Sequence, residues 1–279
     1  MTVPGYDRMI DAIASSADPR PRIEDIRIYT NWVLVKTGKW SLSTVFRGMP
    51  GFDEHPGMDT WMGGWLGRPG LESAMELLSS RETLKRAVGM ACLKSLLPEP
   101  EHVLFGNAID MFEAASPHVP ICFIGHFKDG ADWRSRGRPV SIVELFPRPG
   151  DIHWDEADEV LEKARIVLMT GLTVVNETLS AVVARTPSAL IRVIMGPTVP
   201  PSRALFDFGI DMLGVTLVDD VEAMVGYARL GGGSIAYSPP GALRKINMVR
   251  SADDIRRRLA SLLTDQWEIT GEKEELACG

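Results

Sequence analysis

Residues 166–198 read IVLMTGLTVVNETLSAVVARTPSALIRVIMGPT. Short apolar runs stand near both ends of this stretch, at residues 166–170 and 190–195, and a helical segment separates them. Apolar runs without polar alternation are typical of strands buried on both faces, and a helix between two such strands indicates a right-handed parallel crossover. Similar runs lie at residues 121–124, 140–143 and 212–217. The sequence therefore predicts an α/β domain with a doubly wound parallel sheet.

The segment before this domain has a different pattern. Residues 23–45 are rich in β-branched and aromatic types and are split at residues 36–39, which predicts a hairpin. Apolar residues at three- and four-residue spacing predict a helix over residues 81–97, with Cys92 in its buried stripe. Between them, residues 47–69 are rich in Met, Trp, Gly and Pro and predict a long loop. Three roles are open for this loop: a lid over the cleft, a surface for a partner protein, or a segment packed on the protein's own core.

Composition narrows the class of protein. The chain has 279 residues, 45% of them hydrophobic, and a formal net charge of −7, which is the wrong sign for a protein that neutralises nucleic-acid phosphates. Its apolar runs are far shorter than the ~18 residues of a membrane span, and residues 1–10 do not resemble a signal peptide. We therefore expect a cytoplasmic protein without a nucleic-acid or membrane partner. Its three cysteines form no C-x-x-C pair.

Polar and glycine residues follow the predicted strands. They are Gly125, His126 and Phe127 after the first strand, Glu144 after the second, Thr170, Gly171, Thr173, Asn176 and Thr178 after the third, and Gly196, Pro197 and Thr198 after the fourth. Because the carboxyl ends of parallel strands meet at one edge of the sheet, these residues predict a ligand-binding cleft there.

Glu144 follows Gly125 by nineteen residues, close to the ~20 at which an acidic residue binds ribose hydroxyls in dinucleotide-binding folds. This spacing indicates a nucleoside-like ligand, with a solvated carboxylate at the strand end as the alternative. Phe127 stands where the second glycine of the motif is expected, and its bulk would hold a pyrophosphate away. We therefore favour an adenosyl ligand such as S-adenosylmethionine over NAD.

The third and fourth strand ends offer further contacts. Gly171 permits a tight turn, and Thr173 is expected either to cap the following helix alone or to do so while its neighbours present N–H groups to an anion. Asn176 is expected in the first turn of that helix, pointing into the cleft. Gly196, Pro197 and Thr198 predict either a rigid turn or a hydroxyl aimed at the same edge.

Five histidines show no metal-binding spacing, and only His126 lies at a predicted strand end. It is a candidate general base, a candidate metal ligand with Glu144 or Cys122, or a polar residue without a chemical role. The motifs of serine hydrolases, P-loop NTPases and thiol redox enzymes are absent from the sequence.

Taken together, these segments resemble the putative heavy-metal chelation family. The resemblance rests on VPICFIGHF, IVLMTGLTVVNETLSAVV and IMGPTVPPSRALFDFGIDMLGVTLVDD, with LESAMELLSSRETLKRAVGMACLKSLL upstream. It implies a Rossmann-like domain preceded by a small α+β domain similar to the N-terminal domain of enolase. We place the small domain, with the Met/Trp-rich loop, at residues 1–108 and the Rossmann-like domain at residues 109–279. Leu93-Lys94 stands where the family pattern has Asn-Ala.

Three hypotheses about function follow. In the first, the protein holds a nucleoside-like small molecule such as S-adenosylmethionine, and as a transferase it would use His126 and Asn176 in catalysis. In the second, it binds a divalent metal, a metal complex or a chelating molecule near His126 and Glu144. In the third, it is an interaction protein. A homo-oligomer is compatible with each of them.

Overall fold

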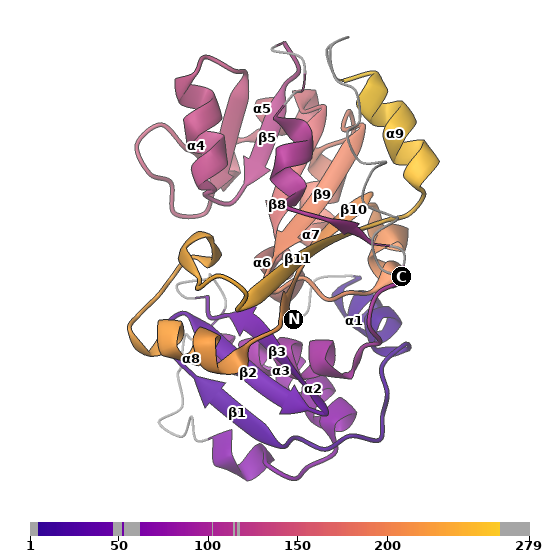
Figure 1. Ribbon diagram of the computed structural model, residues 1–279. Coiled ribbons are helices and arrows are strands. Elements are labelled where there is room, and N and C mark those ends of the chain that lie inside the picture. Colours follow the sequence, from indigo (N-terminus) through magenta and orange to yellow (C-terminus); the bar gives the residue numbers. More distant parts are fainter. Residues whose placement is uncertain are drawn as a thin grey trace, which may run out of the picture.

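The computed structural model describes residues 5–46, 52, 62–101, 103–113, 115 and 118–262. It contains a large eight-stranded sheet and a small three-stranded sheet (Figure 1). The strands of the large sheet are β4 (Leu104–Phe105), β5 (Ile121–Ile124), β6 (Val140–Glu144), β7 (Ile152–His153), β8 (Ile166–Thr170), β9 (Ile191–Gly196), β10 (Met212–Val218) and β11 (Leu243–Val249).

The large sheet is mostly parallel. Its order is β4-β11-β10-β9-β8-β5-β6-β7, and the six strands from β10 to β7 run parallel. Numbered along the chain, these six strands have the 3-2-1-4-5-6 order of the Rossmann fold, with its switch point between β5 and β8. The five strands predicted in this region are β5, β6, β8, β9 and β10, so the predicted fold class is confirmed. The antiparallel strands β4 and β11 were not predicted.

Helices cover both faces of this sheet. One face packs against α4 (Lys128–Ser135), η2 (Ala108–Phe112) and α9 (Ala252–Ala260). The other packs against α5 (Asp158–Lys163), α6 (Leu172–Val175), α7 (Leu179–Arg185) and η4 (Arg203–Phe208). Two further 3-10 turns are η3 (Trp154–Glu156) and η5 (Ile235–Tyr237). The strands between these layers are almost wholly buried, which explains their continuous apolar runs.

The small sheet consists of β1 (Asp25–Ile28), β2 (Trp32–Thr37) and β3 (Lys39–Thr44). The predicted hairpin is present as β2 and β3, which pair around Gly38 at a φ of +86°. A second turn at residues 29–31 adds β1, which was not predicted. The predicted helix is α3 (Thr83–Leu96), and α1 (Tyr6–Ala14), η1 (Met62–Trp65) and α2 (Gly70–Leu78) complete this region.

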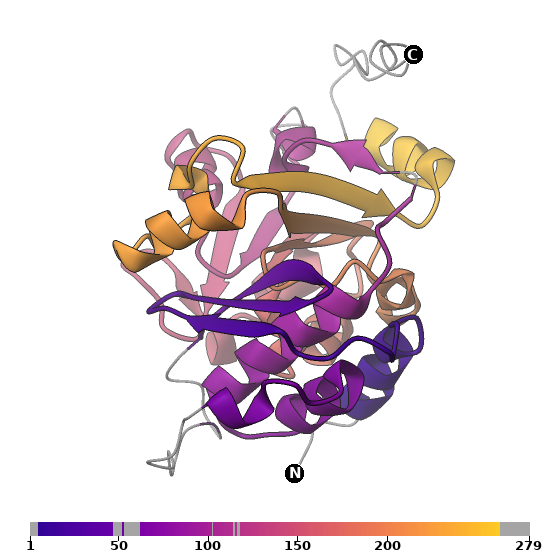
Figure 2. The ribbon, with the colours of Figure 1, turned by 60° about the horizontal axis from the view of Figure 1, so that its bottom comes forward.

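The small sheet is covered on both faces, and one of its two covers comes from the later part of the chain. Helix α3 packs on one face, while α8 (Val221–Arg229), which connects β10 to β11, packs on the other through Met224 and Ala228. Figure 2 shows the sheet between these two layers. The two sheets thus share one folded body, and the predicted boundary after residue 108 falls at the start of η2.

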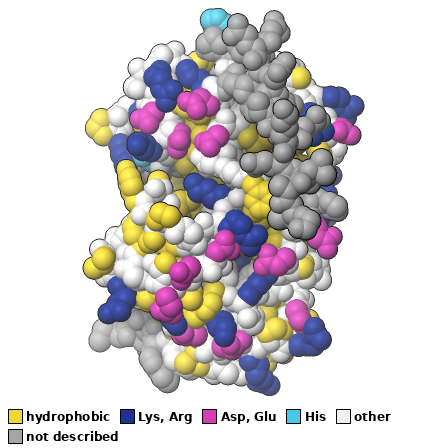
Figure 3. All heavy atoms as spheres, in the orientation of Figure 1, with side chains coloured by type: hydrophobic (Ala, Val, Ile, Leu, Met, Phe, Trp, Pro, Cys, Tyr) yellow, Lys and Arg dark blue, Asp and Glu magenta, His cyan; other side chains and the backbone are white. Residues whose placement is uncertain are grey.

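Some predictions fall outside the described residues. Most of the Met/Trp-rich loop, at residues 47–51 and 53–61, lies there. In the part of the chain that is described, no helix is long and apolar enough to cross a membrane. On the face shown in Figure 3, basic and acidic side chains are interspersed.

Candidate functional site

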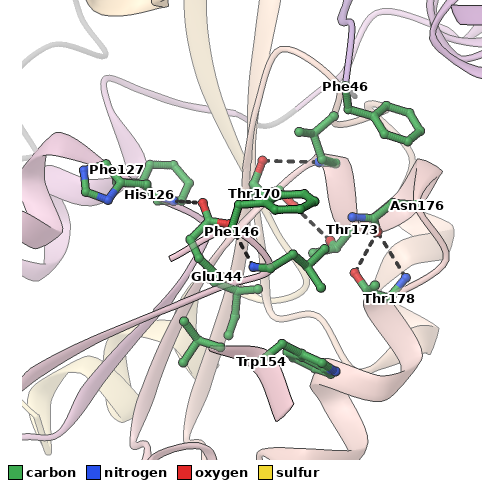
Figure 4. A pocket seen from close by; sticks show the side chains of 15 residues that line it. Phe46, His126, Phe127, Glu144, Phe146, Trp154, Thr170, Thr173, Asn176 and Thr178 are labelled. Carbon is green, nitrogen blue, oxygen red and sulfur yellow. Dashed lines mark hydrogen bonds between the residues drawn. The ribbon is translucent and has the colours of Figure 1, made fainter. Parts of the chain in front are cut away.

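A pocket of about 360 Å³ lies at the switch point of the large sheet. The loops that follow β5, β6 and β8 form its walls, and Phe46 from the small domain closes one side (Figure 4). Of the residues predicted at the strand ends, eight line this pocket: Gly125, His126, Phe127, Glu144, Thr170, Thr173, Asn176 and Thr178. The fold therefore gathers residues that follow β5, β6 and β8, strands whose last residues are up to 46 positions apart in the sequence.

Gly125 makes the turn after β5 possible. Its φ of +104° is a conformation that side chains rarely adopt, and a Cβ at this position would lie 3.2 Å from Cγ2 of Thr170. The following Phe127 packs its ring on Phe123, with the ring centroids 5.6 Å apart. Phe127 lines both this first pocket and a second one beside it. It therefore lies where the two pockets adjoin.

The Glu144 carboxylate is held by backbone donors. Its Oε1 accepts a hydrogen bond from the His126 N–H at 2.7 Å, and its Oε2 accepts one from the Leu145 N–H at 3.2 Å. The side chain is half-buried on the pocket wall. Because a carboxylate has about four lone-pair sites, each oxygen can still accept a bond from a ligand. Glu144 is thus a fixed, partly desolvated acceptor.

His126 is oriented by a buried carboxylate, Asp151, that no sequence pattern predicts. Its Nδ1 lies 3.0 Å from Oδ2 of Asp151, whose side chain is fully buried and whose other oxygen lies 3.2 Å from Arg134. Burial raises the pKa of Asp151, but hydrogen bonds from His126, the Arg148 N–H and Arg134 outweigh it, so the pKa lies below its ordinary value. With Nδ1 facing Asp151, Nε2 is the nitrogen of His126 that remains for chemistry.

The turn after β8 differs from the prediction in one respect. Gly171 is required, because a Cβ there would lie 2.7 Å from Cγ2 of Val199. Thr173 does not cap the helix: its hydroxyl donates to the carbonyl of Thr170 at 2.9 Å, while Thr170 Oγ1 accepts from the Leu172 N–H at 3.3 Å. The N-cap residue of α6 is Gly171, so no side chain caps this helix, and Gly171 is not among the residues that line the first pocket.

Asn176 lines the pocket, but not from the first turn of a long helix. Helix α6 has only four residues and ends at Asn176, and α7 begins anew after Thr178. The Oδ1 of Asn176 accepts from the N–H and the hydroxyl of Thr178, at 3.2 and 2.7 Å. The predicted position in a first helical turn was thus wrong, since the chain breaks between two short helices and the amide bridges the break.

Glu177, in this break, forms a buried ion pair with the small domain. Its φ is +67°, and its Oε1 lies 2.5 Å from Nη2 of Arg86 on α3. The Arg86 side chain is fully buried and also donates to the carbonyls of Val175 and Ser80, at 2.7 and 2.6 Å. This contact ties the pocket residues on either side of Glu177 to α3.

The residues after β9 lie apart from the first pocket. Gly196, with a φ of +119°, and Pro197 line the second pocket. Thr198 is 1% exposed, and its Oγ1 accepts a hydrogen bond from the Thr44 N–H at 3.1 Å. Its hydroxyl therefore binds the small sheet instead of facing the cleft, contrary to the reading in which it is aimed at a ligand.

Comparison with known proteins identifies the family of this chain. Residues 107–247 match the family model DUF364 and residues 10–97 match DUF4213, and both are described as "Putative heavy-metal chelation". The chain belongs to this family. It is 30% identical to an uncharacterized protein of Methanocaldococcus jannaschii over 191 residues, 64% of this chain and 71% of the relative. The resemblance recognised in the sequence is thereby confirmed.

Solved structures of the heavy-metal chelation family share the fold. A DUF364 protein with unknown function from Desulfitobacterium hafniense has a TM-score of 0.72 at 19% identity, covering 90% of this chain and 100% of the other. A second one, from Pyrococcus horikoshii, has a TM-score of 0.67 at 17% identity, covering 88% and 99%. At these identities the likeness supports the fold alone.

The family description calls for a test of metal ligands. Across the described residues, no three or more His, Cys, Asp and Glu side chains come together in a group that could hold a metal ion. Cys122 is buried in β5, and burial raises the pKa of its thiol to about 12. His55, His102 and Cys278 lie outside the described residues. We therefore assign no metal site within the described part of the chain.

Lys94, which stands where the family pattern has Ala, is buried between the two sheets. Its Nζ donates to the carbonyl of Leu42 at 2.8 Å and to the carbonyl of Pro197, so it holds the turn after β9 against β3. Burial lowers the pKa of Lys94 to about 7 from an ordinary value of 10.5. The charged form is thus disfavoured in the folded protein.

The stability of the protein should therefore rise with pH above 7. Between pH 7 and about 10 the unfolded chain carries a proton on Lys94 that the folded protein has lost, so raising the pH favours folding by up to about 1.4 kcal/mol per unit. Urea denaturation of the wild type and of Lys94→Met at pH 7.5 and 8.5 measures this. The difference in free energy of unfolding should shift in favour of the wild type at pH 8.5, and parallel changes in both proteins would contradict the assignment.

Proposed function

We propose that the first pocket binds a small molecule with a nucleoside-like group, and that Glu144 accepts hydrogen bonds from its ribose hydroxyls. The observation that carries this proposal is the carboxylate itself. It stands at the end of β6 beside the switch point, where Rossmann folds bind ribose, and two backbone N–H groups hold it on the pocket wall.

Aromatic side chains around the pocket support a base as part of the ligand. Phe46 is buried, Trp154 is half-buried, and Phe146 is 60% exposed, and all three line the pocket. Figure 4 shows Phe146 beside Glu144 and Thr170. An exposed aromatic ring beside a fixed acceptor suits a base attached to a ribose. The volume of about 360 Å³ lies within the range of roughly 300–1,000 Å³ usual for ligand pockets.

The bulk of Phe127 in the turn after β5 favours an adenosyl compound over a dinucleotide. A pyrophosphate would need to pass close to the turn that Phe127 occupies, whereas S-adenosylmethionine needs no such passage. Thr170, Thr173 and Asn176 would contact the remainder of the ligand. S-adenosylmethionine would supply an activated carbon. In a group transfer the protein would align the two reactants, and Nε2 of His126 is the candidate base.

Metal or metal-complex binding at His126 is a second candidate, which the family description favours. His126 and Glu144 line the same pocket, so a metal already held by a small chelator would find an imidazole and a carboxylate on one wall. A rise in thermal midpoint with Zn²⁺ or Ni²⁺ that His126→Ala abolishes, and that His153→Ala retains, would favour this candidate.

Removal of the Phe146 ring tests the nucleoside proposal. We expect Phe146→Ala to weaken the binding of adenosine or S-adenosylhomocysteine by about 1 kcal/mol, the lower end of the range for base–aromatic stacking, because the ring is partly exposed. Isothermal titration calorimetry measures the change. Phe105→Ala is the matched control, since Phe105 is 73% exposed on β4 and does not line the first pocket. Equal affinity in wild type and Phe146→Ala, or no binding of either compound, would contradict the proposal.

A further inference from the structure

A second pocket, of about 500 Å³, adjoins the first along the same edge of the large sheet. The two share the lining residues His126, Phe127 and Thr170, and the second continues toward β9, β10 and β11. Four glycines line it: Gly106, Gly196, Gly214 and Gly233. The proposed function involves only the first pocket and assigns no ligand to the second.

A buried carboxamide in this second pocket lacks a hydrogen-bond donor. Asn247 on β11 is 1% exposed, and its Nδ2 donates to the carbonyl of Gly106 at 3.1 Å. Its Oδ1 is buried and has no partner among the described residues. Almost all buried polar atoms in folded proteins are paired, so each exception calls for an explanation. Because Asn247 lines the second pocket, a ligand there can supply the missing donor.

Positive charge accompanies this acceptor. Side chains alternate along a strand, so Lys245 projects from the same face of β11 as Asn247, opposite to Ile246 and Met248 in the core. Lys245 is half-buried and lines the second pocket. Within the described part of the chain, no side-chain hydrogen bond or ion pair engages its ammonium group, so the charge is available to an anion.

A helix start lines the opposite end of the second pocket, since β5, which precedes α4, lies four strands away from β11 in the large sheet. Helix α4 begins at Lys128, and no side chain caps its first N–H groups. Lys128 and Asp129 both line the second pocket. Free N–H groups and a lysine favour an anionic group, while Asp129 offers a second acceptor for a donor on the ligand. The pocket thus combines sites for a negative group with acceptors for an O–H or N–H group.

From this combination we infer that the second pocket binds a small carboxylic acid that also carries a hydroxyl or amino group. Its carboxylate lies against Lys245, and its O–H or N–H donates to Oδ1 of Asn247. Because the pockets share His126, Phe127 and Thr170, this acid lies along the same sheet edge as the ligand of the first pocket. The protein then brings two small molecules together, which the first pocket alone does not imply.

Calorimetry with matched acids tests this inference. L-malate and L-aspartate carry a donor beside a carboxylate, whereas succinate has the same chain without the donor. We expect the full-length wild type to bind L-malate or L-aspartate at millimolar concentration or below, and succinate about fivefold more weakly, the worth of one hydrogen bond. Lys245→Met should weaken all three acids. Asn247→Leu should remove the preference over succinate, because it removes the acceptor for the ligand's O–H or N–H.

Controls separate this site from the first pocket. Lys163→Met, which removes an exposed lysine paired with Glu159, should leave acid binding unchanged, and so should Glu144→Gln. Acid binding that survives in Glu144→Gln keeps the result independent of the nucleoside proposal. If Asn247→Leu does not fold, the ratio of malate to succinate in the wild type and the effect of Lys245→Met still decide. Absence of acid binding, equal affinity for malate and succinate, or unchanged binding in Lys245→Met would overturn the inference.

Discussion

Replacement of Arg86 by Met should lower the free energy of unfolding by about 3–5 kcal/mol, the cost of leaving a buried charge without its partner. Arg86 is fully buried, and Glu177 is only 3% exposed in its side chain. The guanidinium also lies 4.7 Å from the ring centroid of Tyr6 and 4.8 Å from that of Phe52. The substitution therefore removes the ion pair, the bonds to two carbonyls and the aromatic contacts at once.

Urea denaturation followed by circular dichroism measures this loss. Arg81→Met is the matched control: Arg81 also pairs with Glu177, at 3.1 Å, but its side chain is 38% exposed, so its loss should cost about 1 kcal/mol or less. The double variant Arg86→Met/Glu177→Gln should recover part of the loss, because neither residue then carries a buried charge. Equal effects of Arg86→Met and Arg81→Met would show that the buried pair is not a main support of the fold.

The same variant links stability to the candidate site. Glu177 lies between Asn176 and Thr178, both of which line the first pocket, and Arg86 comes from α3 in the small domain. The small domain thus positions the break between α6 and α7. Helix α3 therefore helps to position pocket residues although none of its own residues lines the first pocket.

The sheet could be predicted because its signal is local. Each of the five predicted strands is a short apolar run, and burial on both faces explains why none alternates with polar residues. The strand ends could be predicted for the same reason, since topology alone brings Gly125, Glu144 and Thr170 to one edge. The strand β11 was not predicted because its sequence, LRKINMV, is partly polar, and its Asn247 lines the second pocket.

The remaining features depend on partners that are distant in the sequence. Asp151 follows a Pro-Gly turn with no periodic pattern, so nothing local indicates that it orients His126. Lys94 binds the carbonyl of Pro197, 103 residues later, and Arg86 binds Glu177, 91 residues later. A charged residue on a predicted helix is ordinarily solvated, so its burial could not be read from spacing. The capping role predicted for Thr173 was wrong because α6 begins at Leu172, so Thr173 already lies inside the helix.

Loss of the Glu144 carboxylate should have the largest effect on ligand binding. Glu144→Gln keeps the length of the side chain and one acceptor for the His126 N–H, so the turn after β5 should persist. The charged acceptor for the ribose is lost, and hydrogen bonds to charged groups contribute about 1.5–3 kcal/mol, or roughly 10- to 150-fold in affinity. Glu156→Gln is the control, because Glu156 is exposed and does not line the first pocket.

The most direct test combines this variant with a change in the ligand. Calorimetry gives the affinities of wild type and Glu144→Gln for adenosine and for 2′,3′-dideoxyadenosine, which lacks the 2′- and 3′-hydroxyls of the ribose. If Glu144 binds those hydroxyls, the wild type prefers adenosine by about tenfold or more, and Glu144→Gln loses most of this preference. An equal preference for adenosine in both proteins, or no binding of adenosine to the wild type, would contradict the assignment of the first pocket to a nucleoside-like ligand.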